Sequence, residues 1–277
     1  MNVLVKVLLM FIVTQILGLY AGVYILQDAR TNPIVQDFIS VENGVSSLPL
    51  FVVYILLGAV IFLAIIKFHL EILLSLLEIV VISVTSSILF YSVIHPFLAD
   101  ALAAMAIAAL LGIILAISKH FIHLLKNLAA VLSSAGAGAV FGFTFSFLAS
   151  LIFFCIMALY DYIAVFRTKH MVSMAKEIIK HDMSFTITAK EKLPSGRETR
   201  LDLGTGDLAL PIMVEVSAYQ IHPYLSLVTM LGAIAGVSFV LVYAWKHKVF
   251  LPAIPAILFG ILISIAVALG VTFLRLL

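Results

Sequence analysis

Long apolar runs separated by short polar segments follow one another along almost the whole chain. A hydrocarbon layer about 30 Å thick is crossed by roughly 20 residues of α-helix, so runs of this length predict membrane-spanning helices. The nine predicted spans are Val3–Leu26, Leu48–Ile66, Leu70–Ile94, Phe97–Ser118, Asn127–Phe143, Ser146–Phe166, Leu203–Ile221, Tyr224–Trp245 and Pro252–Leu274. The pattern therefore indicates an all-α polytopic membrane protein with nine transmembrane helices.

The boundary between the fifth and sixth spans follows from length, because no polar break marks it. Asp161 is the only charged residue between Asn127 and Phe166. At about 1.5 Å per residue, this stretch is too long for a single crossing. We therefore expect a tight turn near Gly142-Phe143-Thr144 to divide it into two helices.

Composition supports a membrane protein and narrows the classes of function. The 277 residues are 64% hydrophobic and 11% charged, which leaves too little polar surface to cover a soluble core. A net charge of +2, without a basic stripe, argues against nucleic-acid binding. The single cysteine, Cys155, excludes an internal disulfide and leaves a metal–thiolate cluster short of ligands.

The distribution of lysine and arginine predicts the orientation, because these residues accumulate in cytoplasmic loops. One set of loops carries Lys67, Lys119, Lys126, a basic segment from Arg167 to Arg200, Lys246 and Lys248. The opposite loops and the C-terminus carry Arg30 and Arg275. We predict that the N-terminus is cytoplasmic and that the C-terminus lies outside.

The basic segment divides one membrane domain into an N-terminal six-helix portion (1–166), a cytoplasmic loop (167–202) and a C-terminal three-helix portion (203–277). Within the loop, Met171–Ile178 has apolar residues at helical spacing. This spacing predicts a short amphipathic helix at the membrane surface.

Alternating residues predict a β-ribbon later in the same loop. Met183–Lys190 and Glu198–Leu203 read as strands on either side of the turn signal Pro194-Ser195-Gly196. A ribbon just before span seven would hold an extended peptide by strand addition. A mobile connector is the alternative interpretation.

Two aspartates fall inside predicted spans, where a carboxylate is costly and usually functional. Asp161 lies about six residues before the inner end of span six, and Asp207 lies at a similar depth after the start of span seven. Each is therefore roughly 9 Å inside the inner boundary. We expect the two carboxylates to meet.

A pair of close carboxylates shares one proton, which makes one member a base and the other an acid. The base draws a proton from water while the acid polarises a carbonyl group, and no metal or cofactor is required. We hypothesise that Asp207 carries the charge because it lies near a helix N-terminus, and that Asp161 lacks this help and holds the proton. Gly204 and Gly206 permit unusual dihedral angles and close approach of a substrate chain.

Three motifs carry a family resemblance. They are Tyr160-Asp161, Gly204-Thr205-Gly206-Asp207 and Leu251-Pro252-Ala253-Ile254-Pro255. In sequence and order they resemble the YD, GxGD and PAL motifs of the presenilin and signal peptide peptidase family of intramembrane aspartyl proteases. The nine-span plan is similar as well, although the last 120 or so residues hold all three motifs. Ile254 departs from the leucine of the PAL pattern, and as a branched isomer of leucine it should preserve the apolar contact.

The resemblance implies an aspartic endopeptidase that hydrolyses peptide bonds of single-span membrane proteins or signal peptides. Asp161 and Asp207 would form the catalytic pair. Substrate-binding roles would fall to Tyr160, Gly204, Thr205, Gly206, Leu251, Pro252, Ala253 and Ile254. The N-in orientation resembles presenilin, and the compact size resembles an archaeal presenilin homologue in a cell membrane. Homo-oligomerisation stays open.

Two other classes of function compete with a protease. A proton- or ion-coupled transporter also uses buried acids, and Glu71, Glu78 and Glu215 would supply them. It predicts that Glu78 or Glu215 matters as much as Asp161, whereas a protease requires the two aspartates alone. A structural scaffold leaves the cost of two facing buried carboxylates unexplained.

Overall fold

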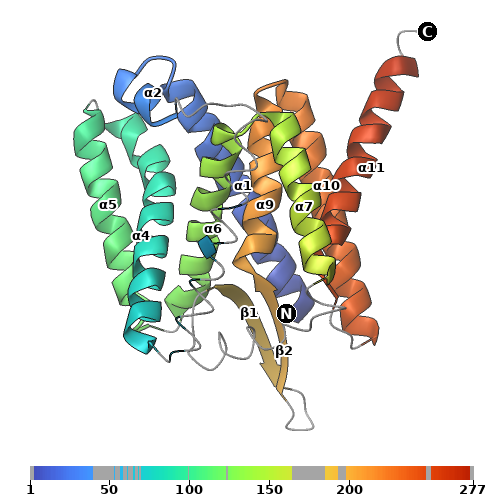
Figure 1. The fold of residues 1–277 in the computed structure, drawn as a ribbon, viewed down its shortest axis with the longest axis horizontal. Helices are drawn as coiled ribbons and strands as arrows, with labels where there is room; N and C mark the ends of the chain where they lie inside the picture. Colours follow the sequence, from blue (N-terminus) through green and yellow to red (C-terminus); the bar gives the residue numbers. More distant parts are fainter. Residues whose placement is uncertain are drawn as a thin grey trace.

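The computed structural model shows a bundle of α-helices with a two-stranded ribbon projecting from one end (Figure 1). It describes residues 3–39, 70–98, 100–122, 124–163, 185–192, 198–247 and 251–274, together with isolated positions between 53 and 68. The predicted all-α membrane fold is confirmed within these ranges.

The helices follow the predicted spans closely. Their bounds are α1 Val3–Asp28, α2 Pro33–Ile39, α4 Glu71–Ile94, the 3-10 helix η2 His95–Phe97, α5 Ala101–Ser118, α6 Leu124–Thr144, α7 Phe147–Ile163, α9 Thr205–Tyr219, α10 Pro223–His247 and α11 Ala253–Leu274. Six helices in the described part of the chain, α1, α4, α5, α6, α10 and α11, are long and apolar enough to cross a membrane. The total of nine spans stays a prediction.

Several boundaries differ from the predicted ones. Span four begins at Ala101, because Phe97 belongs to η2 and Asp100 caps the helix by accepting from the Leu102 N–H. Span seven begins at Thr205, because Leu203 continues the preceding strand. The fifth and sixth spans separate between Thr144 and Phe147, close to the predicted turn.

Three predicted elements cannot be compared in full. The second span, Leu48–Ile66, falls almost wholly outside the described residues, although Val53, Leu57, Gly58, Ile61 and Ile65 are helical. The amphipathic helix at Met171–Ile178 and the turn at Pro194-Ser195-Gly196 lie outside them as well. These three elements stay predictions.

Helix α9 lies at the centre of the bundle, between α1, α6, α7 and α10 (Figure 1). Every residue from Leu208 to Ala218 is buried. A helix that is covered on all sides is shielded from lipid by its neighbours. Because α9 carries Asp207 near its start, this burial fixes the position of that carboxylate relative to the surrounding helices.

Glycines let neighbouring helix backbones approach closely, as the small-residue pairs Gly138/Gly142 and Gly232/Gly236 predict. A Cβ atom on Gly138 would lie 2.6 Å from the Ala209 carbonyl oxygen of α9. A Cβ atom on Gly236 would lie 2.5 Å from the Ala256 carbonyl oxygen of α11. These separations leave no room for a side chain.

We therefore expect Gly236→Ala to destabilise the protein by about 1–3 kcal/mol, the usual cost of overpacking a tight contact. Gly270→Ala is the matched control on α11, because nothing lies within 4 Å of a Cβ atom there. Thermal unfolding in detergent measures both variants. Equal midpoints for the two would contradict the close packing of α10 against α11.

The ribbon pairs β1 Thr186–Lys192 with β2 Glu198–Gly204 in antiparallel register, with Ile187 opposite Leu203. The two strands are thus confirmed, although the first begins three residues later than predicted. Ile187 is 0% exposed and packs with Leu203 into the main hydrophobic cluster, which includes Val3 and Val7 of α1. One face of the ribbon is therefore fixed to the bundle.

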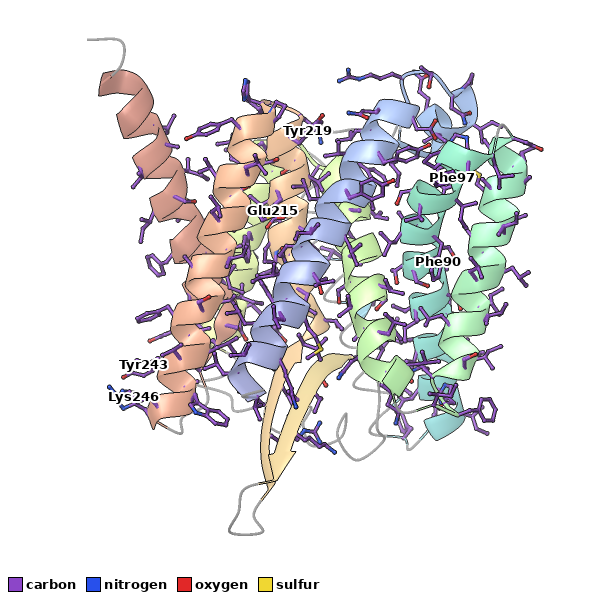
Figure 2. All side chains as sticks on the ribbon, turned by 180° about the vertical axis from the view of Figure 1, so that it is seen from behind. Phe90, Phe97, Glu215, Tyr219, Tyr243 and Lys246 are labelled. Atoms are coloured by element: carbon purple, nitrogen blue, oxygen red, sulfur yellow. The ribbon has the colours of Figure 1, made fainter. Side chains whose placement is uncertain are left out.

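The ribbon marks the end of the bundle at which α1 begins, and α11 ends at the opposite side (Figure 1). Tyr243 and Lys246 project from α10 at the ribbon end, while Tyr219 and Phe97 lie at the other (Figure 2). The start of α1 and the end of α11 therefore lie at opposite ends of the bundle, which agrees with an odd number of spans. Which end faces the cytoplasm stays a prediction.

Candidate functional site

Asp161 lies near the C-terminal end of α7, at the end of the bundle that carries the ribbon. Its side chain is buried, with 3% of the residue exposed. The backbone N–H of Ile254 donates a hydrogen bond to its carboxylate. Ile254 is the second residue of α11, where the first N–H groups have no partner within the helix. Asp161 therefore caps a helix from a different part of the chain.

Asp207 lies in the first turn of α9 and is partly buried. Its Oδ2 accepts a hydrogen bond of 3.2 Å from the backbone N–H of Gly204, the residue that caps this helix. This contact is one half of a capping box, in which the third helical residue binds back to the cap. Asp207 is thus held at the junction of β2 and α9.

Asp161 and Asp207 lie within electrostatic range of each other. The premise that Asp161 lacks the help of a helix N-terminus is wrong, while the hypothesis that Asp207 carries the charge stays a prediction. Asp161 accepts from the Ile254 N–H of α11 just as Asp207 accepts from the Gly204 N–H of α9. The positive ends of two helix dipoles therefore converge on the pair.

The glycines before Asp207 do not use unusual backbone dihedral angles. Gly204 has φ −67° and ψ 148°, an ordinary extended conformation, and neither it nor Gly206 has a positive φ. Gly206 is exposed, and nothing lies within 4 Å of a Cβ atom built on it. Glycine at position 206 instead leaves the backbone beside Asp207 uncovered by a side chain, so that a substrate chain can approach it closely.

The remaining predicted site residues fall into two groups. Pro252, Ala253 and Ile254 are buried and start α11 beside Asp161, and Leu251 packs against the main cluster. Tyr160, by contrast, is 47% exposed. Since neighbouring residues of a helix point about 100° apart, Tyr160 faces outward where Asp161 faces inward.

Thr205 fixes the start of α9 through its backbone. Its N–H donates a hydrogen bond of 2.9 Å to the Phe185 carbonyl oxygen, just before β1. This bond continues the ladder of the ribbon up to the first residue of the helix. The ribbon therefore leads directly into the first turn of α9, which carries Asp207.

Two contacts around the site carry no recognisable signal in the sequence. Buried Gln15 of α1 donates from Nε2 to the Leu208 carbonyl oxygen at 3.1 Å, one residue beyond Asp207. Asn127 of α6 binds the backbone of Thr188 in β1 through both ends of its amide. Each joins residues more than 60 positions apart in the chain, so no local pattern predicts it.

Glu78 and Glu215, two of the acids that a transporter would use, have different neighbours from Asp161 and Asp207. Glu78 of α4 forms a buried ion pair with Lys119, at the end of α5. Glu215 of α9 is 0% exposed, and both of its carboxyl oxygens lack hydrogen-bond partners within the described residues. Glu215 lies inside the bundle (Figure 2), about two helical turns beyond Asp207 along α9.

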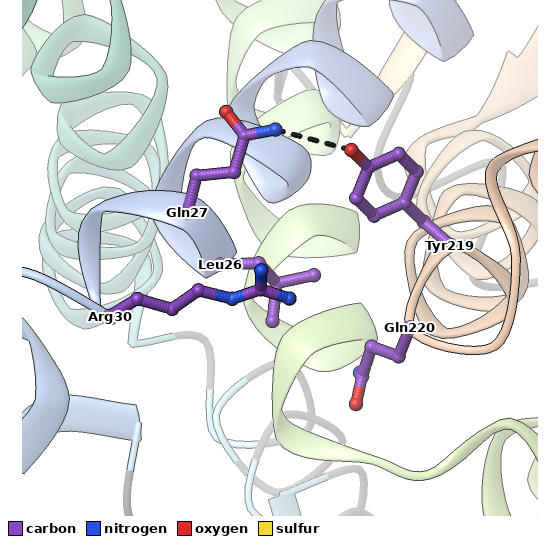
Figure 3. A pocket seen from close by; sticks show the side chains of 5 residues that line it. All are labelled: Leu26, Gln27, Arg30, Tyr219 and Gln220. Carbon is purple, nitrogen blue, oxygen red and sulfur yellow. Dashed lines mark hydrogen bonds between the residues drawn. The ribbon is translucent and has the colours of Figure 1, made fainter.

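A pocket of about 270 Å³ opens at the far end of the bundle, lined by Leu26, Gln27, Arg30, Tyr219 and Gln220 (Figure 3). Gln27 donates to the Tyr219 hydroxyl at 3.2 Å. Tyr219 lies twelve residues beyond Asp207 along α9, or about 18 Å. The C-terminal ends of α1 and α9 meet here, and Arg30 suits their negative dipole ends. This pocket is therefore separate from the two aspartates.

Comparison with known proteins gives one family and one fold. The family model for signal-peptide peptidase and presenilin aspartyl protease matches residues 8–273. A presenilin family intramembrane aspartate protease solved in the C222 space group aligns with TM-score 0.67 and 18% identity over 96% of this chain and 100% of that one. A second such structure, in the P2 space group, aligns with TM-score 0.58 and 20% identity over 92% and 96%. No curated protein matches.

The family match covers nearly the whole chain, including α7, α9 and the start of α11. The two solved structures share the fold over almost the same length. The chain therefore belongs to the signal-peptide peptidase and presenilin aspartyl protease family of intramembrane proteases.

Proposed function

We propose that Asp161 and Asp207 together activate water to hydrolyse peptide bonds of membrane-spanning substrates. The single observation that carries this proposal is that Asp161 and Asp207, on separate helices at one end of the bundle, lie within electrostatic range of each other. In the proposed pair the two carboxyl groups share a proton, and they supply an acid and a base without a metal or cofactor. Their titration belongs to the pair rather than to either residue.

In this mechanism the ionised carboxylate removes a proton from water as the oxygen attacks the peptide carbonyl carbon. The protonated carboxyl group donates a hydrogen bond to the carbonyl oxygen, on which negative charge develops. Collapse of the tetrahedral intermediate breaks the C–N bond, and the amine leaves with a proton. The two aspartates then again hold one proton between them. The Gly204 and Ile254 amides, which bind one carboxyl group each, keep both in position.

The substrate chain must be extended at the bond that is cut, because an intact helix hides its carbonyl groups. We propose that the edge of β2 that faces away from β1 pairs with this extended segment. The Thr205 N–H bonds to Phe185, so the hydrogen-bonded pairs of the ribbon include Ile187 with Leu203. The intervening β2 residues, Asp202 and Arg200, then point their backbone groups away from β1. These groups replace hydrogen bonds that lipid cannot offer.

Bare backbone at Gly206 and the buried start of α11 support this placement of the substrate. A chain paired along β2 runs toward Gly206, where nothing lies within 4 Å of a Cβ atom. Pro252 to Ile254 lie on the other side, beside Asp161. The scissile carbonyl group would then enter between the two aspartates.

Cleavage of a fluorescently labelled single-span substrate, reconstituted with the protein in liposomes, tests the proposal. The wild-type chain should yield two fragments whose new ends are identified by mass spectrometry, and Asp207→Asn should yield none. Proton flux through the same liposomes is the parallel measurement for a transporter. Flux without cleavage over a panel of labelled helices would overturn the proposed function.

A further inference from the structure

The side chain of Asn127, in the first turn of α6, holds the backbone of strand β1. Its Nδ2 donates to the Thr188 carbonyl oxygen at 2.8 Å, and the Thr188 N–H donates to its Oδ1 at 2.9 Å. Because an N–H needs an acceptor and a carbonyl oxygen needs a donor, chemistry fixes this orientation of the amide. Asn127 makes the same two bonds that a neighbouring strand would make.

These bonds lie on the edge of β1 that faces away from β2. Ile187 is a hydrogen-bonded partner of Leu203, so the next residue, Thr188, directs its N–H and C=O outward. Asn127 therefore occupies the middle of one of the two edges of the ribbon. The opposite edge, which Asp202 and Arg200 present, continues directly into Asp207.

A ribbon with two open edges accepts an extended chain on either one. Strands lie about 4.8 Å apart, so a chain added beside β1 would run about 14 Å from one added beside β2. A displacement of about 1 Å already costs much of the rate of a positioned reaction. A substrate on the wrong edge would therefore be bound but not cut.

We propose that Asn127 is a positioning residue that blocks the edge of β1 and so directs an extended substrate to the edge of β2. The same two bonds tie the ribbon to α6, which packs against α9, the helix that carries Asp207. The edge is closed by a side chain of the bundle itself, so the selection exists before substrate arrives. This inference rests on the proposed function.

The test compares Asn127→Leu, which keeps the size of the side chain and removes both polar ends, with Leu128→Ala. Leu128 is the neighbouring residue of α6 and is 44% exposed. For Asn127→Leu we expect kcat and KM for a single-span substrate to fall together by about twofold, because two edges of similar affinity then share the substrate and one of them is unproductive. Part of the cleavage should move to neighbouring peptide bonds. Leu128→Ala should keep the wild-type KM and cleavage positions.

Hydrogen exchange in the substrate-free protein separates this role from a general loss of structure. In Asn127→Leu the Thr188 amide should lose its protection, whereas the Ile187 and Leu203 amides, which bond within the ribbon, should keep theirs. Wild-type KM and cleavage positions in a variant with an unprotected Thr188 amide would overturn the proposal.

If Asn127→Leu does not fold, a second pair of variants tests directly whether substrate binds the edge of β2. Arg200→Pro removes an outward N–H from β2 and leaves the bonds to β1 in place, while Arg200→Ala controls for the lost side chain. We expect kcat/KM to be about tenfold lower for Arg200→Pro than for Arg200→Ala. Equal values would show that substrate does not use this edge. Full activity of Asp207→Asn, in contrast, would overturn the proposed function itself.

Discussion

Replacement of Asp161 or Asp207 by asparagine is expected to lower kcat/KM by a factor of at least about 10²–10⁴, the usual contribution of a positioned acid or base. Asparagine keeps the size of the side chain and an oxygen that accepts from the Ile254 or Gly204 amide. It cannot take a proton from water or serve as a carboxylic acid. Initial rates with a labelled single-span substrate in detergent measure the loss.

The double variant Asp161→Asn/Asp207→Asn should be no slower than the slower single variant. Residues that act as one unit give losses that do not add, and the proton that the proposed pair shares would make these two a unit. Independent roles would instead give losses that multiply. Multiplying losses, or full activity in either single variant, would contradict the proposed pair.

Glu215→Gln is the matched control for these variants. Glu215 is a buried acid on the same helix as Asp207, and no hydrogen bond holds its carboxyl oxygens within the described residues. We expect the glutamine variant to keep its proteolytic activity. Equal loss of cleavage in Glu215→Gln and Asp207→Asn would point to a requirement for many buried acids, as in a transporter.

Much of the fold could be predicted because the bilayer imposes a length on each helix. The apolar runs gave helices α1, α6 and α10 to within a few residues at most ends. The errors lie where a polar cap or a strand interrupts an apolar run. Leu203 is apolar and was predicted to start span seven. It belongs to strand β2 instead, where its side chain is buried against α1 beside Ile187.

The sequence predicted the candidate residues of the site better than the contacts that hold them. Two acids at equal depth on adjacent spans predicted that Asp161 and Asp207 face each other; the structure puts them within electrostatic range, and their action as a pair stays a prediction. The hydrogen bond from Ile254 to Asp161 was not foreseen, because it depends on where a helix from the end of the chain begins. Asn127 was missed for the same reason, since one asparagine at the start of an apolar run has many ordinary roles.

Glu78 and Lys119 illustrate a buried pair of charges with a structural role. Each is 2% exposed, and their ion pair joins the second turn of α4 to the end of α5. Lys126, in the first turn of α6, also lies within electrostatic range of Glu78. One carboxylate therefore serves cations from two neighbouring helices near the ribbon end of the bundle. A transporter would need this acid to bind and release its ion.

Glu78→Ala is expected to destabilise the protein by about 3–5 kcal/mol, because it leaves the Lys119 ammonium group buried without its carboxylate. Chemical unfolding in detergent, followed by circular dichroism, measures the change. The double variant Glu78→Leu/Lys119→Met removes both charges, and we expect it to recover most of the loss, since apolar residues of similar size often replace a buried pair at little cost. Proteolysis by the folded fraction of each variant should stay near the wild-type rate, because the pair joins α4 to α5, whereas the two aspartates lie on α7 and α9. A stable Glu78→Ala protein that had lost its activity would instead assign Glu78 to the reaction.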